Sequence, residues 1–196
     1  MKINNTFKLI ISLIIPQLAG GLGSYFTIGS VKDWYPVLVK PALNPPAWIF
    51  GPVWTTLFLL MGYALYLVWS SYAPADAEAM VGKEASADKK KGIKIALILF
   101  GVQLVLNALW SIIFFGLHSP GGALIEIVFL WLAILVTMIA FYKISPPSPR
   151  LWRTSNPAVH PVRAFFVSNG AWLLLIPYIL WVSFAMYLNY TIYALN

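Results

Sequence analysis

Cysteine is absent from this chain of 196 residues, so disulfide bonds, thiolate metal sites and cysteine nucleophiles are excluded. Charged residues are scarce as well: they make up 10% of the sequence, whereas a soluble globular protein has about 25%. The two histidines, His118 and His160, fall in predicted connections between apolar segments, away from any interior site. We therefore expect a protein whose main solvent is not water, with no metal site and no bound cofactor.

Hydrophobic residues make up 60% of the sequence, and the mean hydropathy is +0.79. They are concentrated in five runs of low charge, each of about 20 residues or more, the length that an α-helix needs to cross a hydrocarbon core. Strands of a membrane barrel would be shorter and would alternate between apolar and polar residues. A single segment can satisfy all its backbone hydrogen bonds in lipid only as a helix. The sequence predicts an all-α integral membrane protein, a single domain over residues 1–196, with transmembrane helices at residues 9–28, 47–72, 95–117, 122–142 and 169–193.

The three long connections differ in composition. Residues 29–46 are rich in Trp, Tyr and Pro and carry few charges, which indicates an ordered cap at the membrane interface. Residues 73–94 are rich in Ala, Lys and acidic side chains and have nothing with which to form a core, so we expect a mobile, solvated loop. Residues 144–168 contain five prolines and three arginines, which predicts an irregular Pro-rich loop.

Basic residues lie almost entirely on one side of the predicted membrane. Eleven of the 13 Lys and Arg residues fall before the first span, in residues 73–94 or in residues 143–163, and two fall in residues 29–46. For co-translational insertion, the positive-inside rule places the N-terminus and both basic loops in the cytoplasm. The net charge of +7 resides in short connections and leaves no soluble face for a duplex, so we expect no nucleic-acid partner.

The first apolar run has an alternative interpretation. Lys2 and Lys8, followed by the apolar residues 9–19, also describe a secretory signal peptide. The apolar character continues well past Gly20, however, and Gly20 and Ser24 lie four residues apart, as at a helix contact face. We therefore expect a transmembrane helix.

Aromatic side chains make up 16% of the sequence, and some of them repeat at helical spacing. Trp54 and Phe58 share one face of the second span, and Trp181 and Ala185 share one face of the fifth. An aromatic belt at the interface explains part of the content. Large rings beside small residues predict either packed contacts or an aromatic pocket.

The third span carries a polar stripe formed by Gln103, Asn107, Trp110 and Ser111. Side-chain amides at membrane depth require hydrogen-bond partners, because lipid offers none, so this face points inward. Two explanations remain open: the stripe makes contacts between helices, or Asn107 and Trp110 orient the polar edge of a ligand.

Glu126 is the only acidic residue within a predicted span. It follows Gly121 and Gly122 closely, so we expect it near a helix N-terminus and the membrane interface, which both favour a carboxylate. A proton-relay role is therefore not expected. Because no second acid lies within the membrane, a catalytic carboxylate dyad is excluded.

Several motifs occur in the order in which they occur in one known family. They are Trp34-Tyr35-Pro36, Lys40-Pro41, Asn44-Pro45-Pro46, Phe50-Gly51-Pro52-Val53-Trp54, Gln103 with Asn107, Trp110-Ser111, Phe114-Phe115-Gly116, Pro177-Tyr178-Ile179-Leu180-Trp181 and Phe184-Ala185. In these motifs the chain resembles the TspO/MBR family, the tryptophan-rich sensory proteins and mitochondrial translocator proteins. The resemblance covers roughly residues 20–196.

The resemblance implies a five-helix bundle, commonly a homodimer, with a pocket that binds tetrapyrroles such as protoporphyrin, sterols and benzodiazepine-type ligands. It implies the mitochondrial outer membrane in a eukaryote and a cell envelope membrane in a bacterium. Phe58 joins the pocket because it shares a helix face with Trp54. By motif position the other ligand-binding residues are Tyr35, Pro45, Trp54, Asn107, Trp110, Trp181 and Ala185.

Three functions remain open. The first is a membrane binding protein or translocator for tetrapyrroles or other flat hydrophobic molecules, including sterols, with a role in stress regulation. The second is an enzyme that degrades porphyrin oxidatively, with Trp54 and Trp181 flanking the ring as redox-active side chains. The third is a non-catalytic membrane scaffold or regulatory partner. The sequence does not choose among them.

Overall fold

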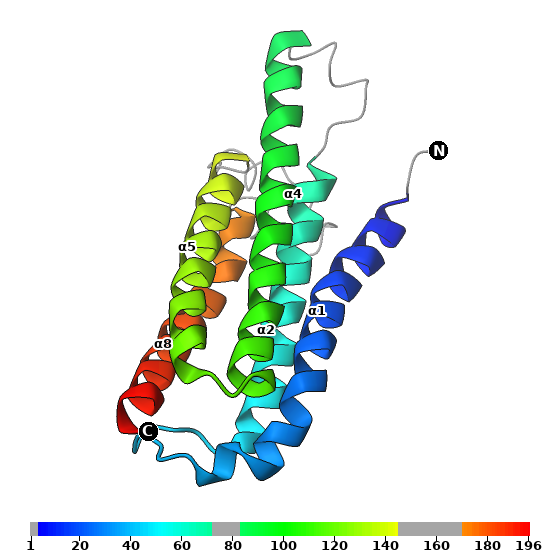
Figure 1. Cartoon of the computed structure of the whole chain (residues 1–196). Coiled ribbons are helices and arrows are strands. Elements are labelled where there is room, and N and C mark those ends of the chain that lie inside the picture. Colours follow the sequence, from blue (N-terminus) through cyan, green and yellow to red (C-terminus); the bar gives the residue numbers. More distant parts are fainter. Residues whose placement is uncertain (1–3, 72–82, 145–169) are drawn as a thin grey trace.

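A computed structural model describes residues 4–71, 83–144 and 170–196. Within these ranges the chain is almost entirely helical and contains no strand. Its long helices lie side by side in one bundle (Figure 1). In chain order the elements are α1 (Asn5–Asp33), the 3₁₀ turn η1 (Tyr35–Val37), α2 (Ala47–Ser70), α4 (Lys83–Ser111), the π-helical turn η3 (Ile112–Gly116), α5 (Pro120–Ile144), the 3₁₀ turn η4 (Ala171–Leu175) and α8 (Ile176–Leu195).

Each of the five long helices is long and apolar enough to cross a membrane. The prediction of five transmembrane helices is therefore confirmed, and the chain is an integral, multi-pass membrane protein. The odd number of spans brings the start of α1 and the end of α8 to opposite ends of the bundle (Figure 1). The spans that the structure defines are residues 5–33, 47–70, 87–116, 120–144 and 171–195.

The second connection is shorter than predicted. Because α4 begins at Lys83, the prediction of a mobile loop over residues 73–94 is wrong for residues 83–94. This segment is rich in Lys and also contains Ala and Glu, which are all strong helix formers. It is continuous with the apolar part of α4, which supplies the helix nucleus. The remainder of that predicted loop lies outside the described residues, as does almost all of the Pro-rich loop predicted at residues 144–168.

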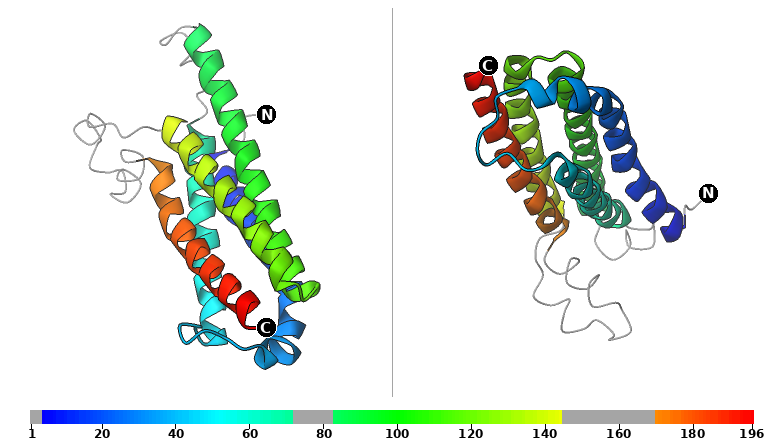
Figure 2. Two further views of the ribbon diagram at one scale, coloured as in Figure 1. Left: turned by 60° about the vertical axis from the view of Figure 1, so that its left-hand side comes forward. Right: turned by 90° about the horizontal axis from the view of Figure 1, so that it is seen from below.

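The helices form a ring, and α2 and α4 also contact each other across it. α1 packs against α2 and α4, α4 packs against α5, and α5 packs against α8. Contacts of α2 with η4 and α8 close the ring. The end-on view in Figure 2 shows the resulting order α1, α2, α8, α5, α4 around the bundle.

α1 and α2 approach each other closely at Gly62. A Cβ atom at this position would lie 2.6 Å from the Ser12 carbonyl oxygen and 2.8 Å from the Leu13 Cα atom. The absence of a side chain thus lets the two backbones meet, as small residues commonly do between membrane helices. The contact fixes the N-terminal half of α1 on α2, whereas the cavity described below lies beside its C-terminal half.

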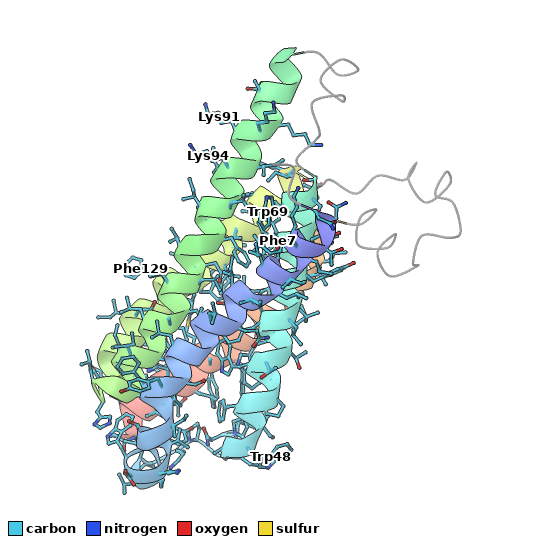
Figure 3. The ribbon with its side chains drawn as sticks, turned by 90° about the vertical axis from the view of Figure 1, so that its right-hand side faces the viewer. Phe7, Trp48, Trp69, Lys91, Lys94 and Phe129 are labelled. Carbon is cyan, nitrogen blue, oxygen red and sulfur yellow. The ribbon has the colours of Figure 1, made fainter. Side chains whose placement is uncertain are left out.

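The outer surface of the bundle carries many large apolar side chains. Phe129 on α5 is 59% exposed and projects outward (Figure 3), and Leu18 on α1 is 67% exposed. Met61 and Val68, by contrast, are fully buried between the helices. In a membrane the outer side chains contact lipid hydrocarbon rather than water, so their exposure does not destabilise the fold.

Candidate ligand-binding site

A cavity of about 620 Å³ lies between α1, α2, α4 and α8. It extends to Tyr35 in η1, at the end of the bundle that residues 34–46 close (Figure 1). Cavities of roughly 300 to 1,000 Å³ with apolar walls and a few polar groups are typical of small-molecule sites. The cavity is therefore large enough for a ligand of several fused rings.

Seven of the eight residues predicted from the sequence line this one cavity. They are Tyr35, Trp54, Phe58, Asn107, Trp110, Trp181 and Ala185. Pro45 does not line it, and instead its carbonyl oxygen accepts a hydrogen bond of 3.1 Å from the Asn44 side chain. The structure thus brings together residues from η1, α2, α4 and α8. That they bind a ligand stays a prediction.

Aromatic rings from α2 and α8 form one wall. The ring of Trp54 stacks on that of Phe58 with centroids 5.4 Å apart, and meets the ring of Tyr178 edge-on at 6.3 Å. Trp181 lies edge-on to Phe50 at 6.0 Å. The Trp181 indole Nε1 is buried and has no hydrogen-bond partner within the described residues. This wall therefore offers a flat apolar surface.

The opposite wall comes from the end of α4 and the π-helical turn η3. Trp110 stacks on Phe114 with centroids 5.1 Å apart, and its Nε1 donates a hydrogen bond of 3.1 Å to Asn189 Oδ1 on α8. Asn189 Nδ2 in turn donates to the Pro120 carbonyl oxygen at 2.7 Å. The wider π turn lets the consecutive rings of Phe114 and Phe115 both line the cavity. The hydrogen bonds fix the orientation of Trp110 before any ligand arrives.

α1 supplies a third wall, which the sequence analysis did not identify as part of the pocket. Gly20, Gly21, Gly23 and Ser24 all line the cavity. A Cβ atom at Gly20 would collide with the ring of Phe58, so glycine is needed here for the ring to reach the cavity. The only signal available was the small residues themselves, and that pattern equally predicts a helix contact.

The connection between α1 and α2 is ordered by hydrogen bonds. The Tyr35 hydroxyl donates to Asn44 Oδ1 at 2.6 Å, and Lys40 Nζ lies 5.0 Å from the centroid of the Tyr35 ring. Burial raises the pKa of the Tyr35 phenol above its ordinary value of 10, and the hydrogen bond to Asn44 offsets this only in part. At the end of α8, Asn196 pairs with the backbone of Val39, accepting at 3.0 Å and donating at 3.1 Å. The predicted cap is therefore held as one unit.

Glu126 does not lie where the sequence reasoning placed it. It is the seventh residue of α5, it is only 6% exposed, and neither of its carboxylate oxygens has a hydrogen-bond partner in the described part of the chain. The expectation of an interfacial carboxylate at a helix N-terminus is wrong, because the effect of the helix dipole is confined to the first turn and the side chain points between helices.

The polar stripe of α4 is divided by the structure. Asn107, Trp110 and Ser111 line the cavity, and Asn107 Nδ2 donates to the Tyr178 hydroxyl at 3.0 Å. Gln103 does not line the cavity, although it is deeply buried, with a relative exposure of 1%. The hydrogen bonds of Asn107 and Trp110 to α8 support the explanation by contacts between helices. That Asn107 and Trp110 orient a ligand stays a prediction.

Comparison with known proteins assigns the family. The model of the TspO/MBR family matches residues 12–195. The chain belongs to the TspO/MBR family. A protein called "Tryptophan-rich protein TspO" from Chlorobaculum tepidum is 39% identical over 191 residues, which cover 97% of this chain and 96% of the relative.

Relatives occur in archaea and in animals as well. A protein called "Tryptophan-rich protein TspO" from Archaeoglobus fulgidus is 34% identical over 98% of this chain and 99% of its own length. A protein called "Translocator protein" from Homo sapiens is 33% identical over 93% of this chain and 86% of its own length. Members of the TspO/MBR family therefore match this chain over nearly its full length.

Proposed function

We propose that this protein binds a flat, largely apolar molecule, such as a tetrapyrrole or a sterol, in the cavity between α1, α2, α4 and α8, and acts as a membrane binding protein or translocator with a role in stress regulation. The observation that carries the proposal is the convergence of Trp54, Trp110 and Trp181 on one cavity of about 620 Å³. Aromatic faces provide large stacking surfaces for a planar ring system.

The polar groups of the cavity support an amphipathic ligand. Lys32, at the end of α1, lines the cavity near the cap, and Asn107 lines it between the aromatic walls. A planar molecule with an anionic edge would place that edge toward Lys32 and its ring between the tryptophans. The name "Translocator protein" of a human relative also supports movement of a ligand.

Titration of the purified protein with protoporphyrin tests the binding proposal directly. We expect quenching of tryptophan fluorescence and a saturable shift of the porphyrin absorption band in darkness, because the ring enters an apolar site beside indoles. The absence of saturable binding by protoporphyrin and by cholesterol would contradict the proposal.

An enzymatic alternative is favoured by one observation, which is that Trp54 and Trp181 line the same cavity. If these indoles take part in oxidative breakdown of porphyrin, illumination in air should give a new chromophore. Trp54→Phe and Trp181→Phe keep most of the stacking surface but remove the easily oxidised ring, so both should retain affinity within a few-fold. Loss of the new chromophore in these variants would support the enzyme, whereas an unchanged conversion rate would exclude a redox role for both residues.

A further inference from the structure

Two buried polar side chains do not line the cavity: Gln103 on α4 and Glu126 on α5. Gln103 and Glu126 are 1% and 6% exposed, and none of their four terminal oxygen and nitrogen atoms has a hydrogen-bond partner within the described residues. Most buried polar groups in proteins are hydrogen-bonded. Two unpartnered side chains in one bundle therefore point to bound species that satisfy them.

Glu126 is connected to the cavity wall through a tyrosine that is fully buried. Tyr178 on α8 is 0% exposed and accepts a hydrogen bond from Asn107, one helical turn from Gln103 on α4. Glu126 lies on α5, which packs against α8, and its charge acts on the Tyr178 hydroxyl over a distance that no direct hydrogen bond spans. Since Asn107 also lines the cavity, a chain of polar groups runs from the cavity wall to Glu126.

An ionised Glu126 would be destabilising in these surroundings. Removing a carboxylate from water without a partner costs several kcal/mol, even after the protein relaxes. A neutral carboxylic acid avoids most of this cost and becomes both a donor and an acceptor. Water molecules with two or more polar partners are commonly retained inside proteins, and the carboxylate oxygens of Glu126 and the Tyr178 hydroxyl provide such partners.

We propose that Glu126, Tyr178 and Asn107 form a hydrated proton-binding site inside the bundle, in which Glu126 takes up the proton. The hydroxyl of Tyr178 accepts from Asn107, so its own hydrogen is free to stabilise the Glu126 carboxylate through a water molecule. When Asn107 turns its amide to a ligand in the cavity, Tyr178 needs another donor, and protonated Glu126 supplies it. Ligand binding therefore promotes protonation of Glu126.

Among the described residues, the lysines of α4, Tyr193 on α8 and His118 before α5 lie away from this site or are engaged elsewhere. The lysines of α4, such as Lys91 and Lys94, lie at the N-terminal end of that helix (Figure 3), whereas Asn107 lies near its C-terminal end. On α8, the ring of Tyr193 lies against Gly121 at the start of α5. In the turn before α5, His118 stacks on Trp34 with ring centroids 4.4 Å apart. Tyr178 is thus the titratable group that faces Glu126.

Infrared difference spectroscopy of the ligand-free protein tests the site. We expect a carbonyl stretching band of a protonated carboxylic acid at neutral pH, shifted in D₂O and lost in Glu126→Gln. Asp33→Asn removes an exposed carboxylate at the end of α1 and should leave the band unchanged. Glu126→Leu provides a second variant if Glu126→Gln does not fold.

Titration of the same band tests the connection to the cavity. Tyr178→Phe and Asn107→Leu should each raise the midpoint at which the band disappears by about one pH unit, a tenfold change in proton affinity, because each removes the support that Tyr178 gives to the carboxylate. A merely structural role of these residues would leave the midpoint unchanged.

The link to binding rests on the function proposed above and is measured with protoporphyrin dimethyl ester, which has no carboxylate of its own. Its affinity should increase as the pH falls through the midpoint, and Glu126→Gln should bind at the low-pH level throughout. No binding at any pH would contradict the proposed function but not the proton site, which the band decides alone. Three results would overturn the site. The first is the absence of a band that depends on Glu126, and the second is a midpoint that Tyr178→Phe does not change. The third is a stability that depends on Na⁺ and that loses this dependence in Glu126→Gln.

Discussion

At the scale of single residues, side chains that line the cavity are ordered by contacts within the protein. Trp110 donates a hydrogen bond to Asn189, and Asn107 donates one to Tyr178. Side chains that are already ordered lose less entropy when a ligand arrives. We therefore expect substitutions that fill the cavity to reduce ligand affinity more than substitutions that replace one aromatic ring by a smaller one.

Ala185→Phe is the most direct of these. Ala185 lines the cavity on the same helix as Trp181, so a phenyl ring at this position occupies space that the ligand needs. We expect protoporphyrin affinity to fall at least tenfold, measured by fluorescence quenching. Ala194→Phe is the matched control, because Ala194 is exposed near the end of the same helix. Equal affinity of the Ala185 variant and the control, in folded protein, would refute the pocket assignment.

The sequence predicted the rings of this site better than its glycines. Trp54, Asn107 and Trp181 belong to motifs with a recognisable spacing, and the structure places all three around one space. Gly20 and Gly23 leave space for the cavity because they have no side chain. In the sequence, a glycine at a cavity wall cannot be distinguished from a glycine at a contact between helices. Glu126 was misplaced because its burial depends on the packing of α4 and α8 around it, which no local pattern encodes.

At the scale of elements, the contact between α1 and α2 depends on one glycine. Gly62→Ala would place a methyl group 2.6 Å from the Ser12 carbonyl oxygen, so the helices must separate. Overpacking of this kind costs roughly 1 to 3 kcal/mol, and we expect a lower melting temperature in detergent.

Gly101→Ala is the control for this prediction. Gly101 lies in the middle of α4, and no neighbouring side chain comes within 4 Å of the position that a methyl group would take, so alanine should be neutral or stabilise the helix by up to about 1 kcal/mol. Equal melting temperatures of the Gly62 and Gly101 variants would show that α1 has room to adjust.

The cap between α1 and α2 depends on the end of α8. Asn196 holds Val39 by a reciprocal pair of hydrogen bonds, so Asn196→Ala should release the backbone of the cap. We expect faster amide hydrogen exchange at Val39 with little change in the transmembrane helices, measured by mass spectrometry. Asn4→Ala removes the side-chain cap of α1 instead and should leave exchange at Val39 as it was.

Elements were predicted from composition to within a few residues, except where two signals conflicted. The charge in residues 83–94 indicated a solvated loop, whereas the helix propensity of the same residues indicated a helix, and the helix prevailed. A charged helix remains stable in water when an apolar helix extends it. Charge therefore marked where α4 leaves the hydrocarbon, not where the helix begins.

At the scale of the whole molecule, an odd number of spans places the start of α1 and the end of α8 in different compartments. Because the chain lacks cysteine, single cysteines report position without background. In sealed vesicles a membrane-impermeant thiol reagent should label one of Asn5→Cys and Leu195→Cys, and Val39→Cys should behave like Leu195→Cys. Labelling of Asn5→Cys and Leu195→Cys from the same side would be incompatible with the five-helix topology.

The length of α4 has a consequence for how the molecule is seated in a bilayer. Its 29 residues and the five of η3 extend about 50 Å at 1.5 Å per residue, whereas the hydrocarbon core is about 30 Å thick. Lys91 and Lys94 lie on the excess turns, and Trp48 is 74% exposed at the other end of the bundle (Figure 3). Displacement along the membrane normal would draw ammonium groups into hydrocarbon on one side or indole into water on the other. These residues act as two anchors, and they hold the capped end of the cavity at the headgroup level of a single leaflet, where an amphipathic molecule dissolved in that leaflet first meets the protein.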